Sequence, residues 1–131
     1  MRFIMGIGLG LGLATAVAAG DVPDEVKVLQ GQQVVLHVYP FLTDEDLQVL
    51  RLVQTNKQAL QLFLTSSGGY SAIAVAPNEG FVRSGSLAPS AIAIGDFPDA
   101  VAAAEATLAG CEAKRKGGEA CVVVMEIGPA S

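Results

Sequence analysis

The first twenty residues limit what the rest of this chain can fold into. Arg2 is followed by an apolar run from Phe3 to Val17 and then by small residues as far as Gly20. This succession of charged, apolar and small segments is typical of a cleavable secretory signal peptide. We therefore expect residues 1–20 to be removed, which leaves about 110 residues to fold outside the cytoplasm.

A retained membrane anchor is the competing interpretation of the same segment. The run from Phe3 to Gly20 is 18 residues long, at the lower edge of the roughly 17–25 residues that cross a bilayer as a helix. The charges that follow it are acidic, beginning with Asp21, whereas a basic cluster normally stops transfer. The pattern favours cleavage, and the chain would meet a membrane only if cleavage fails.

The charge balance of the chain excludes several classes of partner. Acidic residues outnumber basic ones by 13 to 8, and the net charge is −5. Removal of the signal takes away Arg2 alone and makes the domain slightly more acidic. Because an acidic domain repels phosphate groups, we expect neither nucleic acid nor an anionic membrane surface as a partner.

The chain contains two cysteines, Cys111 and Cys121. In an oxidising compartment a lone pair of this kind normally forms a disulfide, and two buried thiols are the alternative. Cys111 falls in the last turns of a predicted helix, on one face with Val101 and Leu108, and that face should point at the sheet. Since Cys121 opens the next strand, we expect the two sulfur atoms to be neighbours.

Apolar periodicity predicts the element order β-α-β-β-α-β. The segment 21–32 is polar and is predicted to be a lead-in to a single domain over 33–131. The predicted elements are a strand at 33–41, a helix of about twenty residues after the cap Thr43, strands at 70–76 and 90–95, a helix from Asp96 to Lys116, and a strand at 121–127. The segment 81–87 is either a short strand or an extended loop.

The compact arrangement of these elements is an α+β fold. We expect one antiparallel sheet in the ferredoxin-like arrangement, with both helices on one face.

The sequence contains no pattern that indicates an enzyme. His37 is the single histidine, and it has no catalytic partner or further metal ligand at a workable spacing. The acidic run after Thr43 is explained by helix capping, and the cysteines are too far apart for a redox motif. We therefore predict no enzymatic activity, no cofactor and no metal.

A candidate interaction surface consists of His37, Tyr39, Tyr70 and Phe81. Val35, His37 and Tyr39 are two residues apart along the predicted strand and therefore share a face of the sheet. We expect this face to be the less buried one.

Three motifs carry a resemblance to known proteins: Tyr70–Gly80, the Ala-rich stretch Ala100–Gly117, and Cys121–Val123. Together they resemble a group of small exported alphaproteobacterial proteins of unknown function, which pair a helix cysteine with a strand-opening cysteine. Some sequences of that group carry the label aminolevulinate synthase, but this chain is far too short for a pyridoxal-phosphate enzyme. The resemblance implies export and a disulfide, and it supplies no activity.

A second resemblance is to SPOR domains, which bind septal peptidoglycan glycans. Ala93–Phe97, followed by an Ala-rich helix, is similar to their strand–Gly–x–Phe–helix opening.

Three hypotheses about function follow. The first is a periplasmic or secreted binding module for an unknown protein or cell-envelope partner. The second is a membrane-anchored accessory subunit of an envelope complex, and SPOR-like glycan binding is a further alternative. The third is an enzyme, which would need His37 to meet an acid and a nucleophile in a cleft.

Overall fold

The structure is a computed structural model, and it describes residues 22–64 and 69–130. The predicted signal peptide, residues 1–20, lies outside the described residues.

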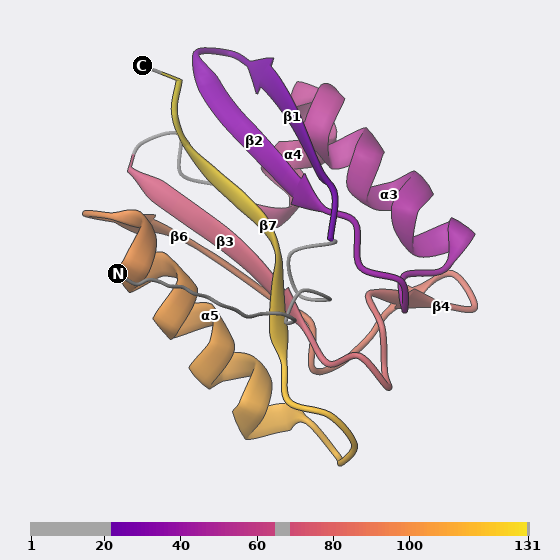
Figure 1. The fold of residues 1–131 in the computed structure, drawn as a ribbon. Helices are drawn as coiled ribbons and strands as arrows, with labels where there is room; N and C mark the ends of the chain where they lie inside the picture. Colours follow the sequence, from indigo (N-terminus) through magenta and orange to yellow (C-terminus); the bar gives the residue numbers. More distant parts are fainter. Residues whose placement is uncertain (1–21, 65–68, 131) are drawn as a thin grey trace, which may run out of the picture.

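The described residues form an α+β fold built on a five-stranded antiparallel sheet with the strand order β1-β2-β7-β3-β6 (Figure 1). The strands of this sheet are β1 (Asp24–Leu29), β2 (Gln32–His37), β3 (Tyr70–Val75), β6 (Ile92–Phe97) and β7 (Val122–Pro129). The helices are α3 (Asp44–Thr55), α4 (Lys57–Phe63) and α5 (Ala100–Lys114). The ambiguous segment 81–87 forms a small hairpin of β4 (Val82–Arg83) and β5 (Ser86–Leu87). The predicted fold class is therefore confirmed.

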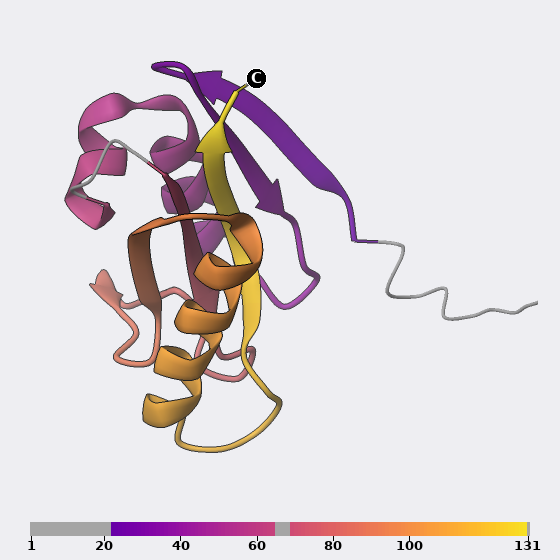
Figure 2. The same ribbon diagram turned by 90° about the vertical axis from the view of Figure 1, so that its left-hand side faces the viewer.

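The helices lie on opposite faces of the sheet, and the prediction that both would lie on one face is wrong. Ile73 and Val75 of β3 belong to the larger core, which contains Leu50 and Leu60 from α3 and α4. Ala74 alternates with them and packs in a second core with Cys111 of α5. Figure 2 shows α5 in front of the sheet, with α3 and α4 beyond it.

The chain connections explain this difference. β2 and β3 run in the same direction because both are antiparallel to β7, which lies between them. β6 and β7 are related in the same way across β3. If the crossover from β2 to β3 and the crossover from β6 to β7 had the same hand, their helices would lie on the same face of the sheet. The helices lie on opposite faces, so the two crossovers have opposite hands. One of them therefore departs from the usual right-handed form.

The strand order also differs from the ferredoxin-like order. That arrangement has the first and third strands of the β-α-β-β-α-β motif in the centre, whereas here the second and last strands, β3 and β7, are central.

The segment predicted as a lead-in contributes a strand. Six residues, Asp24–Leu29, pair with β2 without a register shift, and the tight turn at Gln30 and Gly31 joins the two strands. Both turn residues have positive φ, as a two-residue hairpin turn requires. The folded unit therefore begins before residue 33.

The predicted long helix is divided in two at Asn56. The backbone of Asn56 is extended, the Asn56 N–H donates to the Leu52 carbonyl, and the Asn56 side chain accepts a hydrogen bond from the Ala59 N–H. Asn56 thus ends α3 and caps α4, because an Asn side chain can replace a helical backbone hydrogen bond.

The buried face of α5 agrees with the predicted one only in part: Cys111 is buried and Leu108 packs beside it, but Val101 is not part of that face. Ala103, Thr107 and Cys111 are buried against the sheet, whereas Val101 is 66 % exposed. The helix is capped by Asp99, whose side chain accepts from the Ala102 N–H, rather than by Asp96. Because the buried residues are small, the helix can lie close to the alanines of β3.

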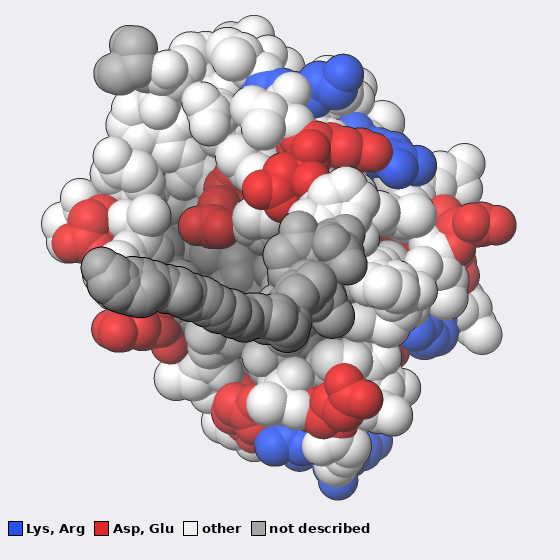
Figure 3. Space-filling view, viewed as in Figure 1, with Lys and Arg blue, Asp and Glu red and all other residues white. Residues whose placement is uncertain are grey.

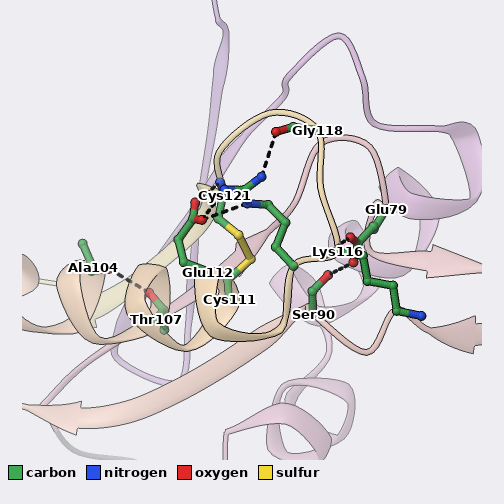
Figure 4. The surroundings of a disulfide bond; sticks show 10 residues. Glu79, Ser90, Ala104, Thr107, Cys111, Glu112, Lys116, Gly118 and Cys121 are labelled. Carbon is green, nitrogen blue, oxygen red and sulfur yellow. Dashed lines mark hydrogen bonds and ion pairs between the residues drawn. A yellow bond between two sulfur atoms is a disulfide. The ribbon is translucent and has the colours of Figure 1, made fainter.

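Cys111 and Cys121 form the predicted disulfide, with 6.2 Å between their Cα atoms (Figure 4). Glu112 strengthens the same junction, since its carboxylate accepts hydrogen bonds from the Cys121 N–H and the Arg115 side chain. The bridge therefore joins the last turn of α5 to the start of β7.

We expect Cys111→Ala to lower the free energy of unfolding by about 2–3 kcal/mol, because the bridge restricts the unfolded chain. Urea denaturation measures the loss. Reductant should destabilise the wild type and leave the variant unchanged, and an equal response of the two proteins would contradict the assignment.

Asp46 connects α3 to the loop that leads into β4. Its carboxylate has no exposed surface and completes the predicted capping box by accepting from the Thr43 N–H at 3.0 Å. It also accepts from the N–H groups of Phe81, at 3.2 Å, and Val82, at 2.8 Å, and it pairs with Arg83. Burial raises the pKa of Asp46, but these hydrogen bonds and the Arg83 charge outweigh burial and lower it.

We expect Asp46→Asn to cost roughly 3 kcal/mol of stability, because the amide cannot satisfy all of these buried donors. The carboxylate contribution is present above the unfolded pKa of about 3.9 and is lost as the pH falls through the lower native pKa. Urea denaturation at several pH values should show the difference between wild type and variant shrinking in acid. Asp44→Asn, an exposed change at the start of the same helix, is the control and should cost much less.

Candidate functional site

Half of one sheet face carries no helix within the described part of the chain. α5 packs on β3, β6 and β7, while the same side of β1 and β2 lies open (Figures 1 and 2). The register pairs Asp24 with His37, Val26 with Val35, and Val28 with Gln33, and opposed residues share a face. We call this surface the open face; its residues are Asp24, Val26, Val28, Gln33, Val35, His37, Tyr39, Tyr70 and Glu126.

Two adjoining hollows lie on the open face, with volumes of about 630 and 310 Å³. Asp24, His37 and Glu126 line both hollows, and the described lining residues include no lysine or arginine. Figure 3 shows carboxylate side chains beside the hollowed centre of this face, with basic side chains towards its periphery. The centre of the open face is therefore acidic.

His37 lies between two carboxylates from the neighbouring strands. Its Nδ1 is 2.6 Å from the Asp24 Oδ1 on β1, and its Nε2 is 2.6 Å from the Glu126 Oε2 on β7. Carboxylates accept hydrogen bonds, so this arrangement suits an imidazolium that donates from both nitrogens. Three adjacent strands are thereby joined by one side chain.

The surroundings of His37 favour its charged form. Partial burial lowers the pKa of His37, but the hydrogen bonds to Asp24 and Glu126 and their negative charges together raise it. Burial, with smaller contributions from the same two carboxylates, also raises the pKa of the neighbouring Tyr39.

This arrangement is suited to holding charge rather than to transferring protons. With both ring nitrogens occupied, His37 has no free lone pair with which to act as a general base. Among the described residues, no group of three or more histidine, cysteine or acidic side chains is arranged to hold a metal ion.

The structure brings together three of the four residues predicted as an interaction surface. His37, Tyr39 and Tyr70 line the hollows of the open face. The Tyr70 ring lies against Gly128, where a Cβ would be 2.7 Å from the ring. Phe81 is a correction: it is 1 % exposed and packs against Phe63 in the larger core, so it cannot contribute to a surface.

The sequence interpretation missed Asp24, Glu126 and the two exposed valines of β1, Val26 and Val28. Residues 24, 26 and 28 alternate along the chain with residues 25, 27 and 29, and the two sets lie on opposite faces of the strand. Such a two-residue period is a strand signal. This signal is weak because charged residues make up half of the strand and its two valines are exposed at the edge of the sheet.

Comparisons of the chain with family models, curated proteins and solved structures give no significant match. The resemblances drawn from the sequence motifs therefore remain predictions. In the described segments, none of the helices has the length and apolar character needed to span a bilayer.

We expect the contribution of His37 to stability to depend on pH. Because folding raises its pKa, this contribution is fully present below the unfolded value of about 6.5 and is lost as the pH rises through the native pKa. The wild type should exceed His37→Gln by roughly 1 kcal/mol at pH 5.5, and by less at pH 9. Urea denaturation of both proteins measures this difference. A gap that is constant with pH would show that His37 carries no charge in the fold.

Proposed function

We propose that this protein is an exported, non-enzymatic binding module whose open face binds a cationic, extended segment of another envelope protein. The observation that carries the proposal is the acidic centre of the open face. Asp24 and Glu126 flank His37, so the three groups keep a net negative charge even when His37 is protonated. Charge complementarity therefore selects a partner that carries lysine or arginine.

The remainder of the open face suits the same partner. Val26 and Val35 form an apolar strip across β1 and β2, and the aromatic rings of Tyr39 and Tyr70 line the two hollows. Lysine and arginine side chains lay their apolar stems on such surfaces and bind to aromatic faces through cation–π contacts. A mixed surface of this kind is typical of protein interaction sites.

The disulfide supports a location outside the cytoplasm, because such bonds persist in oxidising compartments. The N-terminal pattern of charged, apolar and small residues points to the same location. A periplasmic or secreted protein is therefore proposed, with membrane contact only if the N-terminal segment is retained. The acidic net charge disfavours nucleic acid as a partner.

Fluorescence anisotropy with short synthetic probes tests the proposal. We expect a peptide of alternating lysine and valine to bind, and one of alternating glutamate and valine not to bind. The double variant Asp24→Asn/Glu126→Gln should weaken binding about tenfold, because two charge contacts are lost. Added salt should also weaken binding.

Glu105→Gln is the control for position, since it removes a carboxylate from the exposed side of α5, away from the open face, and should leave binding unchanged. Purified peptidoglycan glycan strands form a second arm of the experiment. Binding of glycan in place of the cationic peptide would overturn the proposal in favour of the SPOR-like hypothesis, and so would equal binding of both peptides.

A further inference from the structure

We propose that β1 is a self-association edge, at which two copies of the chain pair their β1 strands antiparallel about a two-fold axis at Val26. This inference concerns the edge of the sheet and goes beyond the binding of a partner on its open face. Among the strands that the structure describes, β1 is the first in the sheet order and pairs with β2 alone. It contains no proline, and its pairing with β2 contains no bulge, so two common protections against edge pairing are missing.

The backbone groups that point away from the sheet can be identified. The Val38 N–H donates to the Pro23 carbonyl, so the backbone of Pro23 faces β2 at a hydrogen-bonded position of the ladder. Inward and outward groups alternate in an antiparallel ladder. The N–H and C=O groups of Asp24, Val26 and Val28 therefore point outward, along the free edge.

The charges on β1 select one register for a symmetric pair. A two-fold axis at Val26 places Glu25 of each copy opposite Lys27 of the other, which gives two ion pairs on the side of α3. An axis at Lys27 would oppose two lysines, and an axis at Glu25 would oppose two glutamates. A lysine on an edge strand disfavours most pairings with another strand. In this register, however, Lys27 lies opposite the carboxylate of Glu25 from the other copy.

The same register satisfies the outward backbone groups and covers apolar surface. Val26 of each copy exchanges two hydrogen bonds with Val26 of the other, and Asp24 pairs with Val28. Val26 is 52 % exposed and Val28 is 66 % exposed, both on the open face. The pairing would extend the strip formed by Val35 and Val26 into the second copy.

The axis stands perpendicular to the sheet, so the two open faces lie on the same side of the dimer. A ten-stranded sheet would result, with an acidic centre on each side of the axis. A six-residue edge buries a small interface, so we expect dissociation in the roughly micromolar-to-millimolar range.

Analytical ultracentrifugation tests the pairing over this concentration range. The sample is the full-length gene product, purified in the form that the cell accumulates. Glu25→Lys should weaken the dimer about tenfold, because it sets a lysine at position 25 opposite the Lys27 side chain of the other copy. Lys27→Glu should weaken it to the same extent by opposing two glutamates. Glu105→Lys makes the same charge change on α5 and should leave the dimer intact.

The equimolar mixture of the two variants is the decisive measurement. Glu25→Lys also breaks the ion pair with Arg51 inside each copy, so a weakened dimer alone could reflect local damage. Only the mixture brings lysine back opposite glutamate at both positions, and it should restore association to near the wild-type level.

A wild-type protein that stays monomeric to millimolar concentration would overturn the inference. A mixture that fails to associate would overturn it as well. A monomer that still binds the lysine–valine peptide would leave the proposed function standing, whereas a dimer that ignores the peptide would remove that function alone.

Discussion

Strand β3 is buried on both faces, and the side chains on each face determine what can lie against it. Ile73 and Val75 fill the core beneath α3 and α4, while Ala74 faces the small residues of α5. A helix is about 10 Å wide and strands are about 4.8 Å apart, so one closely packed helix covers about two strands. α5 is the single described helix on its side of the sheet, and it packs mainly on β3 and β6 and to a lesser extent on β7. The open face of β1 and β2 is therefore a consequence of the same packing.

The buried carboxylate of Asp46 organises the layer formed by α3 and α4 on the other face of the sheet. It accepts a hydrogen bond from the N–H of Thr43, the cap of α3, and also from the N–H groups of Phe81 and Val82, which lie 35 and 36 residues further along the chain at the start of β4. The loop that leads into β4 carries Phe81 into the core under α4. A capping residue thus fixes the position of a hydrophobic side chain as well as the start of a helix, because one carboxylate accepts several hydrogen bonds.

Local signals predicted the fold class, most of the strands, the capping box at Thr43 and the bond between Cys111 and Cys121 from the sequence. These features depend on periodicity, on caps and on short separations along the chain. The choice of face for α5 and the burial of Phe81 depend on the hand of a crossover and on contacts across the chain, which local patterns do not contain. β1 was missed because an exposed edge strand carries polar residues on both faces. The β1 residues of the candidate site, including Asp24, were therefore not predicted.

The two carboxylates around His37 connect the stability of the edge to the charge of the open face. Asp24 begins β1 and Glu126 lies on β7, and the imidazolium between them offsets their mutual repulsion. As the pH rises and His37 loses its proton, this repulsion is no longer compensated and β1 is held less firmly. The same deprotonation makes the open face more negative, which would strengthen the proposed attraction for a cationic partner. If the proposed binding occurs, the stability of the β1 edge and the affinity of the open face should change in opposite directions with pH. A cationic group bound near Asp24 and Glu126 would then replace the positive charge that His37 loses.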